Sequence, residues 1–217
     1  SKVPHSVEHP VERAQVRRYL YDILEDMGGE PEIHEYDSIK LRYGGYFDIG
    51  NVYCQFDPLS GPADSYIMMV AHFDSRFRQT KLQKTVYSYG AGDDAYGVGS
   101  ILELLSQALK YRDEWHQGVR ILFTDSEENA LDGMKCAAKY NPELFENVGY
   151  VVNLESRGMN GPVLLFETSA NNENVLDLYS EAKAPYGYSL TTVVYRFLPN
   201  NTDFTIVKDS IPGINFS

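Results

Sequence analysis

Ile67-Met-Met-Val-Ala-His-Phe-Asp-Ser75 is the stretch that decides the fold, because an apolar run leads directly into a histidine and an aspartate. Short apolar runs bounded by polar residues predict buried strands, and strands without alternation are typical of parallel sheets covered on both faces. In open α/β sheets, ligands bind beyond the carboxyl ends of the strands. We therefore expect His72 and Asp74 to lie at a functional site.

Acidic residues follow three more segments of the same kind. They are Asp93 and Asp94 in the glycine-rich loop 90–97, Glu127 and Glu128 after the apolar run 119–125, and Glu155 after the apolar run 149–154. A histidine and several carboxylates then meet at one edge of one sheet. That ligand set suits a divalent metal ion.

Taken singly, each of these motifs has an ordinary structural explanation. His72-Phe-Asp74 is also typical of a strand-end histidine that is hydrogen-bonded to a neighbour. Gly90-Ala-Gly-Asp-Asp94 is also typical of a turn and a helix N-cap, or of a phosphate cradle, although no Gly-Lys-Ser/Thr follows. Adjacent carboxylates at Glu127 and Glu128 repel each other unless a cation or a proton intervenes. The conjunction of the motifs favours a metal site in which one glutamate is a ligand and the other a free base.

The remaining chain alternates between helical and extended patterns. Helices are predicted at 11–27, 95–111, 131–140 and 173–184, and strands at 32–37, 46–56, 162–168, 191–197 and the end of 206–217. This alternation predicts an α/β fold: a single domain with a mostly parallel central mixed sheet and helices on both faces. Residues 1–10 are expected to form an N-terminal arm. Residues 75–89 are expected to form a solvated surface loop rather than a substrate clamp.

Composition excludes several classes of protein. The 217 residues are 43% hydrophobic and 23% charged, which indicates one globular domain. The net charge of −12 argues against nucleic acid or an anionic membrane as the main partner. No stretch reaches the ~20 apolar residues of a membrane span. Cys54 and Cys136 are interpreted as buried free thiols.

Six short segments of the sequence, taken together, resemble conserved segments of the M28 zinc metallopeptidases. The resemblance is to the endoplasmic-reticulum and vacuolar-membrane branch of that family and its bacterial relatives in particular. The blocks are Val70-Ala-His-Phe-Asp-Ser75, Gly90-Ala-Gly-Asp-Asp94, Leu122-Phe-Thr-Asp-Ser-Glu-Glu128, Asn153-Leu-Glu155, Asn201-Thr-Asp-Phe204 and Ile211-Pro-Gly-Ile-Asn-Phe216. The resemblance covers residues 11–217. It implies a zinc-dependent exopeptidase-like fold, an aminopeptidase activity on peptides, and an extracytoplasmic, luminal or membrane-attached location.

The resemblance also implies a ligand map for two zinc ions that share a bridging carboxylate and a bridging water. His72 and Glu155 would bind one ion, Glu128 would bind the other, and Asp93 would bridge them. Asp74 would not bind metal itself but would orient the imidazole of His72, and Glu127 would act as the general base.

The chain departs from the family pattern at one ligand. The family places a last histidine in a Tyr-His-Thr block after the Pro-Gly-Ile-Asn-Phe strand. The histidines of this sequence are His5, His9, His34, His72 and His116, and none of them has that position. We expect residues 11–217 to be a catalytic domain that lacks its C-terminal segment. In this form we expect the domain to bind metal incompletely and to be nearly inactive.

Three alternative functions remain open: a non-catalytic binding module, a single-zinc glutaminyl cyclase and a calcium-binding protein. His72 argues against calcium, because calcium prefers oxygen ligands.

Overall fold

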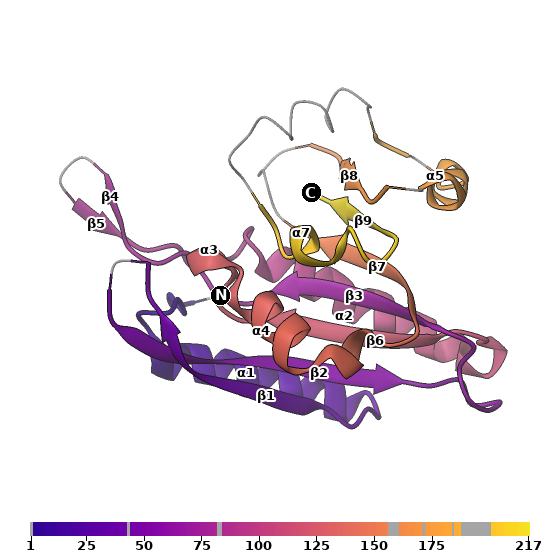
Figure 1. Cartoon of the computed structure of the whole chain (residues 1–217), viewed down its shortest axis with the longest axis horizontal. Coiled ribbons are helices and arrows are strands. Elements are labelled where there is room, and N and C mark those ends of the chain that lie inside the picture. Colours follow the sequence, from indigo (N-terminus) through magenta and orange to yellow (C-terminus); the bar gives the residue numbers. More distant parts are fainter. Residues whose placement is uncertain are drawn as a thin grey trace.

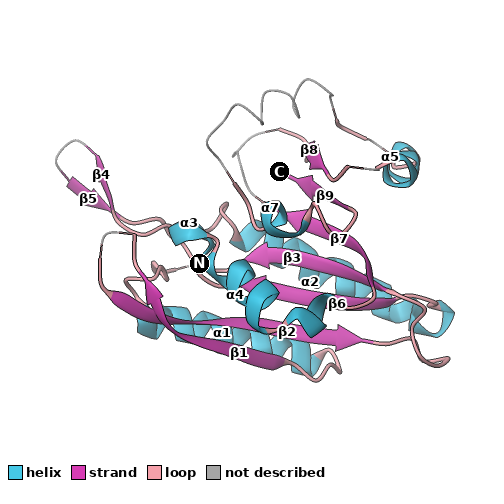
Figure 2. Cartoon of the chain, in the orientation of Figure 1, coloured by secondary structure: helices cyan, strands magenta, loops and turns pink. Residues whose placement is uncertain are grey.

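A mixed seven-stranded β-sheet runs through the molecule, with helices on both faces (Figures 1 and 2). The structure is a computed structural model that describes residues 2–42, 44–81, 84–155, 161–170, 172–183, 185–187 and 201–217. In spatial order the strands are β1 (Glu32–Lys40), β2 (Tyr46–Phe56), β6 (Gly118–Thr124), β3 (Tyr66–His72), β7 (Val148–Leu154), β9 (Gly213–Phe216) and β8 (Leu165–Thr168).

The four central strands β6, β3, β7 and β9 run parallel. The outer strands β1, β2 and β8 pair antiparallel with their neighbours. β3 therefore lies between two parallel neighbours, and β6 is buried along its whole length. This confirms the predicted α/β class with a parallel centre, and it brings the carboxyl ends of β3, β6 and β7 to one edge.

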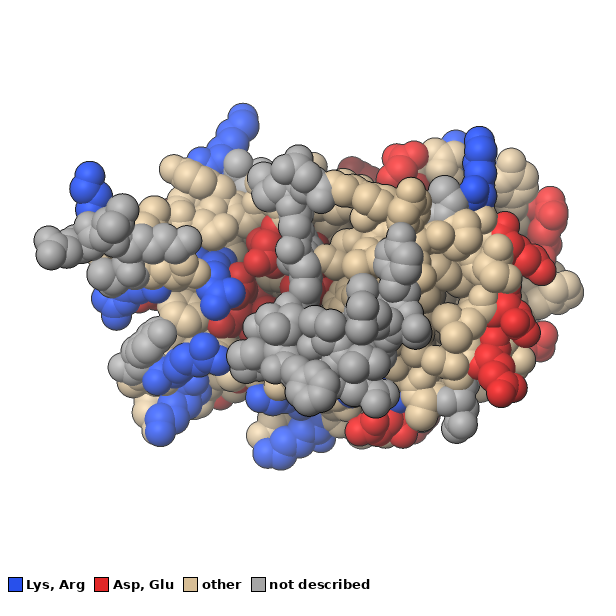
Figure 3. Space-filling model, turned by 90° about the horizontal axis from the view of Figure 1, so that it is seen from above, with Lys and Arg blue, Asp and Glu red and all other residues tan. Residues whose placement is uncertain are grey.

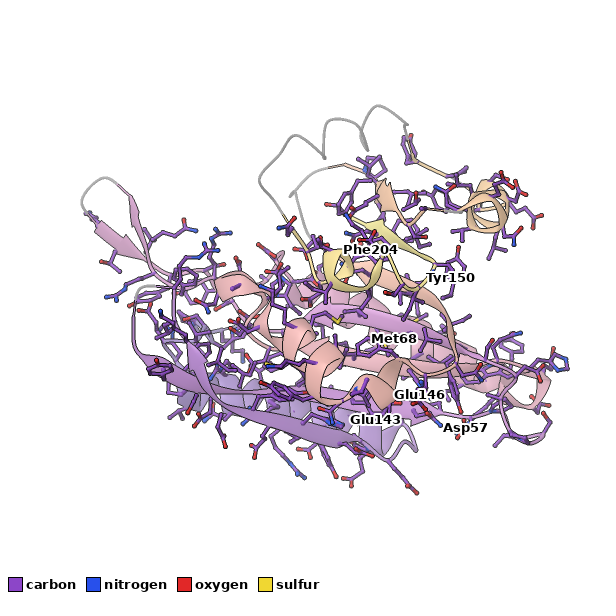
Figure 4. All side chains as sticks on the ribbon, viewed as in Figure 1. Asp57, Met68, Glu143, Glu146, Tyr150 and Phe204 are labelled. Carbon is purple, nitrogen blue, oxygen red and sulfur yellow. The ribbon has the colours of Figure 1, made fainter. Side chains whose placement is uncertain are left out.

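Four buried clusters lie between the sheet and its helices, and the two largest are on opposite faces. The helices are α1 (Pro10–Asp26), α2 (Ala95–Ala108), α3 (Glu127–Ala130), α4 (Asp132–Tyr140), α5 (Glu173–Ser180) and α7 (Phe204–Val207), with 3-10 turns η1 (Leu109–Glu114) and η2 (Pro142–Phe145). One cluster joins Leu24 of α1 and Ile101 of α2 to one face of the sheet. The other joins Phe204 of α7 and Met68 of β3 on the opposite face (Figure 4).

Several predicted elements differ from the structure in their bounds. The loop expected at 75–89 contains a short hairpin of β4 (Gln79–Lys81) and β5 (Lys84–Val86). The helix expected from 131 begins one residue later, and the short helices α3 and α7 were not predicted at all. The strand expected at 162–168 is limited to β8, and the helix expected at 173–184 is described only as α5. The strand expected at 191–197 lies outside the described residues.

The N-terminal residues pack closely against the domain. His5, Ser6 and Val7 are buried, and α1 begins at Pro10. The backbone N–H of His5 donates to the hydroxyl of Ser75 at 2.9 Å. Residues 5–7 therefore support the segment that follows β3, a role that the polar sequence of the expected arm did not indicate.

The cysteines and the hydropathy of the helices were also the subject of predictions. Cys54 and Cys136 are both buried free thiols, as predicted. Among the residues that the structure describes, no helix combines the length and hydropathy that crossing a bilayer requires.

Candidate metal centre

His72 is the last residue of β3 and is 1% exposed. Its Nδ1 atom lies 3.0 Å from the carbonyl oxygen of Asp74 and 3.4 Å from Asp74 Oδ1. Oxygen atoms of this kind accept hydrogen bonds, so Nδ1 carries the proton and Nε2 is the nitrogen that faces the site. Such an arrangement is how proteins orient a histidine that binds metal through its other nitrogen.

Two carboxylates from other segments face Nε2 of His72. Asp93 Oδ1, from the loop before α2, lies at 3.0 Å, and Glu155 Oε1, from the end of β7, lies at 3.7 Å. One ligand atom from each of the three residues lies within 4.8 Å of the others. The structure thus brings together three of the four predicted metal ligands.

Glu127 and Glu128 begin α3, directly after the turn that follows β6. Both are buried, at 9% and 8% exposure. Glu128 Oε2 lies 2.9 Å from a guanidinium nitrogen of Arg76, and Glu128 Oε1 has no hydrogen-bond partner. Within the described residues, the three-ligand group does not include Glu128. The fourth predicted ligand thus lies outside this three-residue group, with one oxygen held by an arginine and the other without a hydrogen-bond partner.

The turn before Glu127 is fixed by a buried network around Asp125, which the sequence reading did not single out. Asp125 Oδ1 lies 3.3 Å from Arg13 of α1, and its Oδ2 accepts from the Gly50 N–H at 3.0 Å. A side-chain oxygen of Asn51 accepts from the Asp125 N–H at 3.0 Å. A Cβ at Gly133 would lie 2.4 Å from the Asp125 carbonyl oxygen, so only glycine fits there. Elements distant in sequence thus hold both glutamates in place.

Asp203, just before α7, is a second site residue that was not singled out. It is 1% exposed and accepts a hydrogen bond from the hydroxyl of Thr124, at the end of β6. Its Oδ1 atom has no hydrogen-bond partner. The only signal for it in the sequence was its place in the block Asn201-Thr-Asp-Phe204.

The shifted pKa values of the site show that its buried carboxyl groups lose their protons less easily than exposed ones do. Burial raises the pKa of Glu128 to about 8, with the Asp93 carboxylate adding to the effect. Burial also raises the pKa of Glu127 well above its usual value, with Glu155 adding to the effect, although His72 opposes the shift. Burial alone would lower the pKa of His72, but its hydrogen bonds with Asp74, Asp93 and Glu155 outweigh burial and raise it well above 6.5.

The residues at this site offer the kinds of atoms that bind a divalent metal ion. Nε2 of His72 and two carboxylates form a nitrogen and oxygen ligand set that zinc accepts. The unpartnered Oε1 of Glu128 and the unfavourable charge of the buried carboxylates would both be satisfied by cations. The residues therefore fit a divalent metal centre.

Comparison with curated proteins finds relatives named for metallopeptidase and protease activity. The chain is 31% identical to endoplasmic reticulum metallopeptidase 1 of Mus musculus over 181 residues, which cover 81% of this chain and 19% of that protein. It is 28% identical to the vacuolar membrane protease of Saccharomyces cerevisiae (strain YJM789) over 177 residues, which cover 80% of this chain and 17% of that protein. The chain thus spans about a fifth of the length of these relatives.

Comparison with solved structures finds the same fold. A Zn-dependent exopeptidase from Parabacteroides distasonis ATCC 8503 matches with a TM-score of 0.72 at 20% identity, over 98% of this chain and 77% of that chain. Bacteroides thetaiotaomicron glutaminyl cyclase bound to N-acetylhistamine matches with a TM-score of 0.72 at 19% identity, over 98% of this chain and 78% of that chain. At these identities the likeness concerns the fold alone.

A family model covers most of the sequence. The model of peptidase family M28 matches residues 51–217, a range that begins in β2 and includes every candidate site residue described above. The resemblance first noted in the separate sequence blocks is therefore confirmed over most of the chain. This chain belongs to peptidase family M28.

Proposed function

We propose that this chain is the catalytic domain of a zinc-dependent aminopeptidase, which hydrolyses the N-terminal peptide bond of its substrates. The observation that carries the proposal is the convergence of His72, Asp93 and Glu155 within 4.8 Å, beside the buried pair Glu127 and Glu128. Membership of peptidase family M28 supports it.

In this proposal the residues hold two zinc ions. His72 and Glu155 would hold one ion, Glu128 would hold the second, and Asp93 would be a ligand shared by both. Bound zinc would acidify the attacking water and stabilise the charge that develops on the carbonyl oxygen.

Glu127 serves as the general base in this scheme. Among the described residues its carboxylate forms no ion pair, whereas the neighbouring Glu128 is held by Arg76. A carboxylate without a fixed partner is free to accept a proton from water and to pass it to the leaving amine. Asp74 positions both sides of the site, because it orients His72 and accepts the Glu127 N–H at 2.9 Å.

The cellular location of this domain is inferred from the names of similar proteins. The similar proteins are named for the endoplasmic reticulum and the vacuolar membrane. We infer that this domain works in a lumen or attached to a membrane.

The test is the analysis of peptide products by mass spectrometry after incubation with zinc-loaded protein. We expect stepwise loss of N-terminal residues from a chain extended to supply the last histidine of the family pattern, and little turnover by residues 1–217 alone, whose five histidines do not include it. In the matched variant Glu127→Gln, we expect a loss of activity of at least about 100-fold with unchanged zinc content. Loss of ammonia from peptides with N-terminal glutamine would instead indicate a cyclase. Zinc binding without any product would indicate a binding module.

A further inference from the structure

Arg76 lies at the solvent-facing edge of the metal centre. It comes two residues after Asp74, and its guanidinium contacts Glu128 at 2.9 Å. The Arg76 side chain is 46% exposed, whereas that of Glu128 is 5% exposed. One side of the guanidinium thus faces a proposed metal ligand and the other faces the solvent from which substrate arrives.

The backbone around Arg76 is anchored on both sides. Ser75 and Phe77 are buried, although Arg76 between them is exposed. Ser75 is paired with His5, because the His5 N–H donates to its hydroxyl at 2.9 Å and the Ser75 N–H donates to the His5 carbonyl oxygen at 3.4 Å. The backbone on both sides of Arg76 is thus held in place, and its guanidinium is held by the contact with Glu128.

Positive charge gathers around this edge although the chain as a whole carries −12. Among the described residues, exposed cationic side chains include Arg42 in the turn between β1 and β2, and Arg76, Arg78 and Lys84 in the segment after β3. The N–H of Arg42 donates to Asn129 of α3 at 2.9 Å, which brings that turn beside the site. In Figure 3, Lys and Arg side chains gather toward the left end of the face, next to Asp and Glu side chains nearer its middle.

The two arginines of the segment after β3 differ in how they are paired. Arg78 Nε lies 2.9 Å from Glu8 of the N-terminal segment, so its charge is already matched away from the site. Within the part of the chain that the structure describes, the ion pair of Arg76 is with Glu128, whose other oxygen has no hydrogen-bond partner. Arginine has more N–H groups than this contact uses, and its planar fork suits a second carboxylate.

We propose that Arg76 is a specificity-determining residue that binds a carboxylate of the substrate beside the metal centre. This inference rests on the proposed peptidase function. The substrates favoured are peptides with an Asp or Glu side chain next to the scissile bond, or short peptides whose free C-terminal carboxylate reaches the same point. Both share one chemistry, a carboxylate opposite a half-exposed guanidinium. The other cations around this edge would attract such peptides to a protein that is otherwise acidic.

The test compares kcat/KM for matched peptides on zinc-loaded protein. The pairs are Glu-Ala-Ala-amide with Gln-Ala-Ala-amide, Ala-Glu-Ala-amide with Ala-Gln-Ala-amide, and Ala-Ala-Ala as free acid with its amide. We expect the wild type to prefer the carboxylate in at least one pair by about tenfold or more, as a charged hydrogen bond allows. The pair that shows the preference tells which carboxylate is bound.

Two variants decide whether Arg76 is responsible. Arg76→Gln should reduce the preference to less than about threefold, whereas Arg78→Gln, the same change two residues along, should keep it. The proposal is overturned if the wild type shows no preference, if both variants lose it equally, or if Arg76→Gln slows both members of each pair alike. The last result would mean that Arg76 serves only to neutralise Glu128.

A binding measurement separates this proposal from the proposed activity. If the wild type cleaves none of the peptides, turnover does not report the preference, and the same pairs are titrated by calorimetry into zinc-loaded wild type and Arg76→Gln. Tighter binding of the acidic member by the wild type alone would support carboxylate recognition by Arg76. Equal binding of both members would overturn it.

Discussion

The side chain of Asp74 accepts a hydrogen bond from the backbone N–H of Glu127 at 2.9 Å, and this contact joins the end of β3 to the start of α3. The same oxygen lies 3.4 Å from Nδ1 of His72. Asp74 is fully buried, so water does not compete for either contact. One carboxylate therefore fixes the proposed metal ligand and the proposed base relative to each other.

Asp74→Asn should separate these two tasks. The amide oxygen can still accept the Glu127 N–H, but the negative charge beside His72 is lost. We expect zinc affinity or turnover to fall by about 10–100-fold, the usual effect of losing such a support. Zinc affinity from competition with a chelator, together with kcat, checks this. Asp74→Ala should be worse than Asp74→Asn, and equal values for the two variants would contradict the role of the Glu127 contact.

Arg13→Met should destabilise the protein strongly, because it leaves Asp125 buried without its closest cation. Arg13 is 4% exposed and Asp125 is fully buried. Breaking a buried pair from one side typically costs about 3–5 kcal/mol of the free energy of unfolding. The matched control is Arg18→Met on the same helix, whose exposed pair with Asp22 should be worth no more than about 0.5 kcal/mol. Urea unfolding measures both, and similar losses would show that Asp125 does not depend on Arg13.

Asp203 gives a prediction about pH for the metal-free protein. Burial raises the pKa of Asp203 to about 7, above its usual 3.8. The folded protein therefore holds this proton at pH values where the unfolded chain has lost it. Stability should fall as the pH rises from about 4 to about 7.

Asp203→Asn, which resembles the protonated side chain, removes the contribution of Asp203 to that dependence. Compared with the wild type, the metal-free variant should have a similar Tm at pH 4. At pH 8 its Tm should be higher by at least about 3 °C, the shift that roughly 1 kcal/mol produces in a domain of this size. Thermal unfolding of both proteins across this pH range is the measurement. A variant that is less stable than the wild type at pH 8 would show that Asp203 is held as a carboxylate.

The sequence alone could predict those site residues that follow a recognisable strand, because the geometry of a parallel sheet brings the ends of such strands together. His72, Glu127, Glu128 and Glu155 each follow an apolar run, and parallel strands bring their carboxyl ends to one edge. Asp93 was found because glycines mark the loop before α2. These inferences need only the periodicity of strands and the rule for where ligands bind in α/β sheets.

The rest depends on contacts between segments far apart in the chain. Arg76 and Glu128 are separated by fifty-two positions, and Arg13 and Asp125 by 112. No local pattern indicates that His5 would be buried against Ser75, or that Asp203 would meet Thr124. The β4–β5 hairpin was missed because its strands are three residues each and mostly polar, so they lack the alternation that identifies a strand.

Zinc titration of Asp93→Asn beside Asp94→Asn tests the central claim most directly, because the two neighbouring aspartates have different tasks. Asp93 faces His72 at 3.0 Å, whereas Asp94 caps α2 by accepting the Gly97 N–H at 3.0 Å. Asparagine is an equally good N-cap, so Asp94→Asn should bind zinc like the wild type. Asp93→Asn should bind markedly less zinc, because one shared ligand is lost from both proposed ions. Unchanged zinc binding in Asp93→Asn would contradict the metal centre described here.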